Sequence, residues 1–145
     1  MTMTTREAFE RGTDTFNAHD VNAFAEVLAD DVVFVEPGGM RGEGKAACVA
    51  FYGSWFDAFP DARVEVHGVH ILDDLAVEEG TFTGHQNGGL HGPMGDVSPT
   101  GRAVGLDYIQ VLRFRNGNHV SFNLMFDRLS MLEQLGVVQA PAPRA

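Results

Sequence analysis

Apolar and polar residues alternate along two neighbouring stretches, 104–114 and 120–126, which flank the residues from Arg115 to Asn118. An Asn-Gly pair between two such stretches is a strong signal for a β-hairpin. We therefore expect two antiparallel strands, each with an apolar face set by the two-residue period. The residues expected on these faces are Leu106, Tyr108, Gln110, Leu112 and Phe114, and then Val120, Phe122, Leu124 and Phe126. Gln110 interrupts an otherwise apolar surface, which makes it a candidate functional residue.

The rest of the chain reads mostly as helices first and strands afterwards. A capping box at Thr4-Thr5-Arg6-Glu7 predicts the start of the first helix. The other expected elements are a short helix ended by Asp30-Asp31, a strand at 32–36, a helix at 44–59, strands at 64–72 and 75–83, and a short helix between Asp127 and Gly136. The glycine-rich residues 85–101 are expected to form one long loop, a kind of segment that is commonly functional.

Helices followed by strands indicate an α+β fold, in which a curved antiparallel sheet wraps around the N-terminal helices. Both faces of the 104–114 strand look apolar, with Ile109 and Val111 opposite Gln110. One face is expected to enclose a cavity, and the other to be covered by a second copy of the chain, giving a homodimer. We expect a single domain over residues 1–136 and a flexible tail over 137–145.

The composition narrows the classes of partner. A net charge of -10 argues against binding to nucleic acid or to anionic membranes, both of which require basic surfaces. Cys48 is the single cysteine, so no intrachain disulfide can form. The first residues lack the pattern of a signal peptide, and no apolar run is long enough to span a membrane. We expect a cytoplasmic protein.

Four stretches together, 16–37, 41–66, 98–120 and 126–136, resemble the SnoaL-like polyketide cyclases. That family belongs to the nuclear-transport-factor-two-like superfamily, which also contains the ketosteroid isomerases. The resemblance implies a cone-shaped α+β barrel with an open apolar mouth. Leu124 stands where those cyclases carry an acid, and Gln110 stands where they carry a histidine.

The ketosteroid isomerases match at other positions. Their general base, the aspartate of an Asp-Pro pair, corresponds to Glu36 before Pro37. Their protonated aspartic acid, in an Ile-Asp-x-x-Arg-Phe stretch, corresponds to Gln110. An aromatic lid residue corresponds to Phe126, and their tyrosine on the first helix falls near Gly12.

Glu36 and Gln110 satisfy the requirements for removing a proton beside a carbonyl group. That chemistry uses a carboxylate base in an apolar site and a fixed donor where the enolate oxygen forms. The alternative is that Glu36 is a solvated charge and that Gln110 binds a main-chain group. His85 and His91, around the glycine-rich loop, are further candidates for acid–base work at the mouth, or are simply solvated.

Several apolar residues are expected to line a pocket for a flat polycyclic ligand, or to form ordinary core. They are Phe16, Phe34, Phe51, Trp55, Tyr108, Phe122, Leu124 and Phe126. No cluster of His, Cys and carboxylate residues has metal-ligand spacing, so we expect neither metal nor cofactor.

The sequence therefore predicts a cofactor-free enzyme that cyclises or isomerises an apolar, polyketide- or steroid-like carbonyl compound. Three alternatives stay open: a non-catalytic binder of a hydrophobic metabolite, an epoxide hydrolase or hydroxylase on the same fold, and a pure interaction module.

Overall fold

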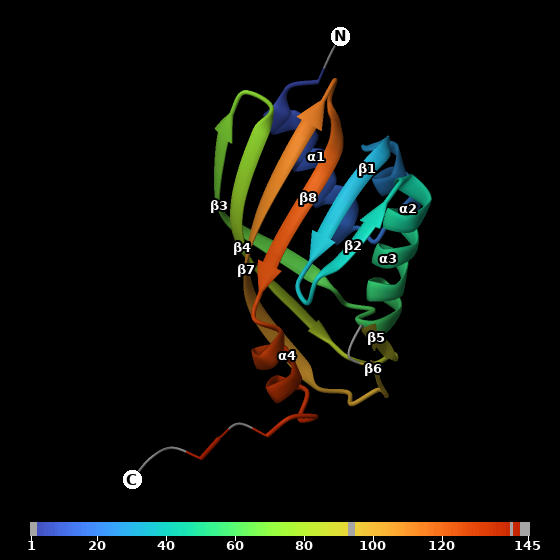
Figure 1. Cartoon of the computed structure of the whole chain (residues 1–145), viewed down its shortest axis with the longest axis vertical. Helices are drawn as coiled ribbons and strands as arrows, with labels where there is room; N and C mark the ends of the chain where they lie inside the picture. Colours follow the sequence, from blue (N-terminus) through green and yellow to red (C-terminus); the bar gives the residue numbers. More distant parts are fainter. Residues whose placement is uncertain (1–2, 93–94, 140, 143–145) are drawn as a thin grey trace.

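The computed structural model describes residues 3–92, 95–139 and 141–142, and its main feature is a curved sheet of six strands (Figure 1). The strand order is β2-β1-β8-β7-β4-β3, so the curved sheet stays open between its edge strands β2 and β3. The elements are α1 (Thr5–Asn17), α2 (Val21–Glu26), β1 (Leu28–Glu36), β2 (Met40–Glu43), α3 (Lys45–Ala58), β3 (Arg63–Leu72), β4 (Leu75–His85), β5 (Leu90–Gly92), β6 (Gly95–Val97), β7 (Ala103–Arg115), β8 (Asn118–Phe126) and α4 (Arg128–Gln134). The predicted α+β class is confirmed.

The helices cover one side of this sheet. Helix α1 packs on β3 and β4, whereas α3 packs on β1 and β2 (Figure 1). Both predicted caps are present: Thr4 and Glu7 form the capping box of α1, and the Asp127 carboxylate accepts a hydrogen bond from the Ser130 amide at 3.0 Å. Between the helices and the sheet lies the buried apolar core.

One strand pairing differs from the predicted antiparallel sheet. Strand β1 runs parallel to β8, and the remaining neighbours in the six-stranded sheet are antiparallel. Strand β1 also begins earlier than expected, at Leu28, so Asp30 and Asp31 do not end a helix but lie within the strand. Both aspartates are exposed and face cations, Asp30 near Lys45 and Asp31 near Arg115. These ion pairs stand where the register of β1 against β8 shifts.

The predicted β7–β8 hairpin is present, with a change of register. Asn116 and Gly117 both have positive φ, at 52° and 79°, which suits the tight turn. Beyond the turn, Phe114 pairs with His119 while Arg113 pairs with Ser121. Val120 is therefore the extra residue of a β-bulge and does not share the face of Phe122, as the alternation had predicted. The bulge turns His119 inward in its place.

The segment expected to be one long loop contains a small β-hairpin, made of β5 and β6. Gln86 is fully buried at the start of this segment, and its side chain forms hydrogen bonds with residues near the end of the segment. Its side-chain nitrogen donates to the carbonyl of Val97 at 3.2 Å, and its oxygen accepts from the Thr100 amide at 3.0 Å. A buried side chain with these bonds holds the segment in one conformation. Residues 93–94 of this segment lie outside the described residues.

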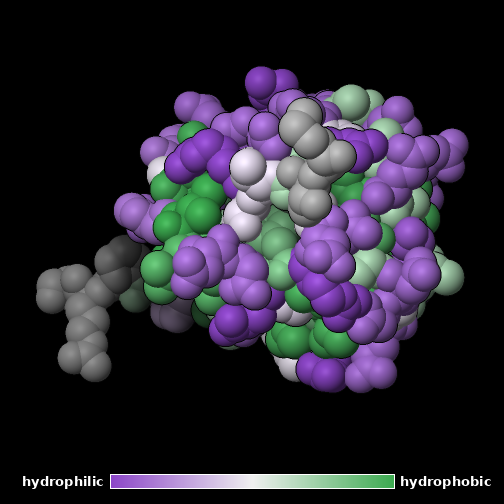
Figure 2. Space-filling view, turned by 90° about the horizontal axis from the view of Figure 1, so that it is seen from above, coloured by the Kyte–Doolittle hydropathy of each residue, from purple (hydrophilic) through white to green (hydrophobic). Residues whose placement is uncertain are grey.

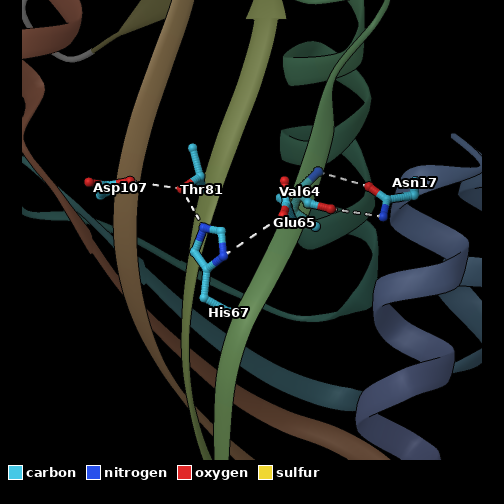
Figure 3. A network of polar contacts seen from close by, with 6 residues as sticks. All are labelled: Asn17, Val64, Glu65, His67, Thr81 and Asp107. Carbon is cyan, nitrogen blue, oxygen red and sulfur yellow. Dashed lines mark hydrogen bonds and ion pairs between the residues drawn. The ribbon is translucent and has the colours of Figure 1, made fainter.

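The outer face of the sheet is mixed rather than wholly apolar. Figure 3 shows His67 bonded to the Thr81 hydroxyl at 2.8 Å, and that hydroxyl donating to Asp107 at 2.8 Å. Next to this polar group, Ile109 and Met125 are 51% and 60% exposed. Polar residues also cover most of the end seen in Figure 2, with apolar areas between them. None of the described helices has the length and apolar character needed to cross a membrane.

Candidate functional site

A cavity of about 390 Å³ lies between the sheet and the helices, a volume typical of small-molecule sites. Its walls come from α1, α3, the inner face of the sheet, the β5–β6 hairpin and α4. Seven of the eight predicted substrate-binding residues line it, namely Phe16, Phe51, Trp55, Tyr108, Phe122, Leu124 and Phe126. Phe34 is instead a core residue: it is 4% exposed and its ring packs on Phe51 and against Gly42.

A row of four residues crosses the inner face of the sheet within this cavity. Gln110 on β7 pairs with Leu124 on β8 and with Glu78 on β4. Val35 pairs with Asn123 in the parallel β1–β8 ladder, so Glu36 comes next to Leu124. The row therefore reads Glu36, Leu124, Gln110, Glu78. It brings the two predicted residues Glu36 and Gln110 together and adds a second carboxyl group.

Glu36 ends β1 in an apolar environment. Its side chain is buried, with 5% of the residue exposed, and within the described chain its Oε1 atom has no hydrogen-bond partner. Burial disfavours the charged form and raises the pKa of this carboxyl to about 8. Glu36 is therefore mainly a neutral carboxylic acid at neutral pH.

Glu78 is the carboxyl group that the sequence analysis missed. It is 4% exposed; the Tyr108 hydroxyl donates to its Oε2 at 3.0 Å, and the Gln110 amide donates to its Oε1 at 2.5 Å. Burial raises its pKa, and these two hydrogen bonds act in the opposite direction. The Glu78-Glu79 pair could have indicated a buried carboxyl group. Neighbouring residues on a strand face opposite sides, so one of the two glutamates had to face inward.

Gly80 makes room for the tyrosine that holds Glu78. A Cβ atom at this position would lie 2.5 Å from the Tyr108 hydroxyl and 2.7 Å from the Glu65 carbonyl oxygen. Any residue larger than glycine would have to move Tyr108 or the edge strand β3. The contact between Tyr108 and Glu78 therefore depends on this glycine.

The two predicted histidines lie apart from the row. His91 lines the cavity at the β5–β6 hairpin and pairs with Asp96 at 3.0 Å. His85 is not among the lining residues; its Nδ1 lies 2.6 Å from the Asp61 carboxylate and its side chain is 55% exposed. The structure thus places Glu36 and Gln110 together, His91 by the hairpin, and His85 outside the cavity.

A third histidine, not considered from the sequence, reaches the cavity beside α1. His119 is 2% exposed and its Nε2 lies 3.1 Å from the Ala8 carbonyl oxygen, so Nε2 carries the proton and donates. Its ring stacks on Phe122 and lies 2.8 Å from where a Cβ atom on Gly12 would stand. Burial lowers the pKa of His119 to about 4 and keeps it neutral.

Metal-binding groups do not gather in this site. Within the residues that the structure describes, no three His, Cys, Asp or Glu side chains stand close enough to hold an ion. Cys48 is free and buried, and burial next to Glu36 raises the pKa of its thiol to about 12. The polar side chains that line the cavity carry carboxyl, phenol, amide, imidazole, hydroxyl and guanidinium groups.

The chain has the nuclear-transport-factor-two-like fold. In this α+β fold a curved, open sheet lies over helices, and here the two enclose an apolar cavity with buried polar groups. Within that class, the chain belongs to the SnoaL-like domain family, whose match covers residues 9–122. A search of curated protein sequences found no match.

Solved structures show the same fold at low sequence identity. A protein from Jannaschia sp. CCS1, named a SnoaL-like polyketide cyclase, has a TM-score of 0.82 and 22% identity, with 92% of each chain covered. IdmH from Streptomyces antibioticus, named a polyketide cyclase, has a TM-score of 0.77 and 23% identity over 92% of this chain and 99% of its own. An epoxide hydrolase of M. tuberculosis, described as LEH-like, has a TM-score of 0.72 and 16% identity over 94% and 92%.

Proposed function

We propose that this protein is a cofactor-free enzyme that moves a proton beside the carbonyl group of an apolar substrate, in a cyclisation or isomerisation. The observation that carries the proposal is the pair of buried carboxyl groups, Glu36 and Glu78, at the two ends of one row across the cavity. The row spans three strand spacings, about 14 Å between backbones. Both side chains line the same cavity.

The surroundings divide the two carboxyl groups into a base and an acid. Glu78 accepts two hydrogen bonds, which favour its ionised form, so it is the base that removes the α-proton. Glu36 has no such partner within the described chain and remains neutral, so it donates to the oxygen on which the enolate charge develops. Gln110 then positions Glu78. The sequence had suggested other roles, with Glu36 as the base and Gln110 as the donor to the enolate oxygen.

The walls of the cavity favour a flat, largely apolar substrate. Aromatic side chains from α1, α3, β4 and β8 surround the row, including Phe16, Trp55, Phe82 and Phe126. Aromatic surfaces stack on ring systems, and a dry environment strengthens the electrostatic effect of each donor. A polyketide-like ketone with fused or linked rings satisfies both conditions.

Exchange of α-deuterons in a simple aromatic ketone, 1-tetralone, tests this proposal. We expect the wild-type protein to catalyse exchange, and E78Q and E36Q each to lower the rate by at least about a hundredfold. E79Q is the matched control, because Glu79 is the exposed neighbour of Glu78 on the opposite face of β4. Full activity in E78Q, or equal losses in E79Q, would contradict the assignment.

A second candidate function is the binding of a hydrophobic metabolite without chemistry. Leu124 favours it, because this residue stands in the middle of the row where the resemblance to the cyclases calls for an acid. Tight binding of ring compounds with no exchange of 1-tetralone would support this alternative.

We also propose that the outer face of the sheet forms a homodimer. Ile109 and Met125 stand on adjacent strands as a directly paired, exposed apolar couple. Sedimentation equilibrium of the wild type against I109E checks this, and a monomeric wild type would exclude it.

A further inference from the structure

Tyr52, on α3, is a cavity residue that the chemistry above does not use. Aromatic rings surround it on several sides: the centroid of its ring lies 4.9 Å from that of Phe24, 5.3 Å from that of Phe51 and 6.0 Å from that of Phe16. The residue is 8% exposed and lines the cavity. Packing of this kind leaves the ring one position, so its hydroxyl has a fixed location.

No hydrogen bond of the Tyr52 hydroxyl is found within the described residues, and its oxygen is not one of the fully buried atoms that lack a partner, so it is open to the cavity. A buried tyrosine usually finds a hydrogen-bond partner. Tyr108 gives the contrast within the same cavity, because its hydroxyl donates to Glu78 at 3.0 Å. The cavity therefore presents two phenols, one engaged in holding a carboxylate and the other free to bind a ligand.

The position of Tyr52 relative to the carboxyl groups follows from α3. Cys48 and Tyr52 are one helical turn apart and both buried, so they share one face of the helix. Glu36 and Tyr52 both line the cavity, so their side chains border the same space. Helix α3 packs on β1, the strand that carries Glu36 (Figure 1). Tyr52 thus stands on the Glu36 side of the cavity, across from the base.

Tyr52 keeps its phenol proton at neutral pH. Burial, together with the neighbouring acidic groups, raises the pKa of this phenol well above its usual range. A phenol that keeps its proton does not serve as the base, but it can donate a hydrogen bond. Such a donor is worth most where a negative charge forms in a dry site.

We infer that Tyr52 is a catalytic residue that donates a hydrogen bond to the enolate oxygen, next to Glu36. The inference rests on the proposed function and adds a second hydrogen-bond donor for the negative charge on the enolate oxygen. Glu78 takes the α-proton, the electron pair of that C–H bond forms the C=C bond, and the carbonyl π pair moves to oxygen. Tyr52 and Glu36 bind that oxygen while the charge is present. In the exchange reaction the Glu78 carboxyl trades the hydron it has taken for one from solvent and returns the new one to carbon, as the C=C pair forms the C–H bond and the oxygen pair restores the carbonyl.

The substitution Y52F removes the hydroxyl and keeps the ring that packs against the neighbouring aromatics. We expect it to lower the limiting rate of 1-tetralone exchange by about a hundredfold. Its pH profile should not move, because the hydroxyl does not touch Glu78. Y108F is the contrasting variant: it removes a donor to Glu78 and should shift the pH profile upward.

A second measurement does not depend on turnover. 2-Naphthol resembles an enolate in carrying its oxygen on an sp² carbon, and its affinity should fall by about tenfold in Y52F. Wild-type exchange rates and naphthol affinity in Y52F would overturn the inference. So would a rate loss that comes with a shifted pH profile and unchanged naphthol affinity, since that pattern indicates a structural role.

The two proposals fail in different ways. If the wild type catalyses no exchange, the proposed function falls, and the naphthol comparison still decides whether Tyr52 is the donor in the cavity. If the wild type exchanges and Y52F matches it in rate and affinity, the proposed function stands and the role of Tyr52 is wrong.

Discussion

Gln110 and Glu78 face each other across adjacent strands, with the Gln110 Nε2 atom 2.5 Å from the Glu78 Oε1 atom. The amide gives a buried carboxylate a donor that does not depend on pH. Together with the Tyr108 hydroxyl, which is also on β7, it favours the ionised form of this carboxyl group on β4.

Replacing Gln110 by leucine should raise the pKa of Glu78, because burial remains while one donor is lost. The acid limb of the pH–rate profile for 1-tetralone exchange should therefore move to higher pH. The buried Oε1 atom is also left unpaired, which should lower the free energy of unfolding by about 1–3 kcal/mol. Q110E is a useful companion, since a second carboxyl beside Glu78 should move the profile further. An unmoved acid limb in Q110L would show that Glu78 does not titrate in catalysis.

Glu36 should make the protein less stable as the pH rises. Below its ordinary pKa of 4.5 the group is neutral in both the folded and the unfolded chain. As the pH rises from there toward 8, the unfolded chain loses this proton and the folded chain keeps it, so folding becomes less favourable. Across this interval, E36Q should gain stability relative to the wild type by on the order of 3 kcal/mol.

Urea denaturation at several pH values measures this difference directly. The comparison of the two proteins isolates Glu36, because the other titrating groups are common to both. A constant difference between E36Q and the wild type would mean that Glu36 is solvated in the folded protein.

Gly12 should not tolerate alanine, although alanine is the better helix former. A Cβ atom would lie 2.8 Å from the buried His119 ring, which cannot move away because Phe122 stacks on it. We expect G12A to lower the free energy of unfolding by about 1–3 kcal/mol. The control is G53A within α3, where nothing stands within 4 Å of the new atom. G53A should raise stability by about 0.5–1 kcal/mol; similar effects in both variants would contradict the packing argument.

Replacing Gly80 by alanine should lower activity, because the space at Gly80 is what lets Tyr108 reach Glu78. In G80A the new methyl group meets the Tyr108 hydroxyl at 2.5 Å and must displace it from Glu78. Exchange activity should fall, and the pH profile should shift in the same direction as in Y108F. G105A, on the neighbouring strand and in open space, should leave the rate of exchange unchanged. A normal pH profile in G80A would show that Tyr108 does not set the charge of Glu78.

Much of the fold was predictable because its signals are local. The capping box at Thr4, the Asn-Gly turn and the Asp127 cap all involve residues that are close in sequence, and the structure confirms each. Two of the three polar residues in the row were predicted: Gln110 because it interrupts an apolar face, and Glu36 because Glu36-Pro37 resembles the Asp-Pro pair of the ketosteroid isomerases.

The other half of the site depends on register, which local patterns do not fix. Glu78 and Glu79 lie on opposite faces of a strand whose two faces look alike in sequence. The sequence pattern therefore did not indicate which of the two glutamates would be buried. His119 faces the cavity because Val120 is accommodated as a bulge, and the alternation alone placed Val120 there instead. His85 lies in an exposed position beside Asp61, which is distant in sequence.

The flexible tail predicted over 137–145 stays a prediction. Val137 and Val138 lie among the residues that line the cavity, next to α4. Residues 140 and 143–145 of this segment lie outside the described part of the chain.

The strand order has a consequence for how the protein is made. Strand β1 reaches β7 and β4 through β8, which is the last of the described strands in the sequence. A nascent chain that has not yet released β8 lacks the strand that joins β1 to β7, so it cannot place Glu36 in one row with Glu78. Fragments cut before β8 should therefore lack the proposed exchange activity, however well their helices form.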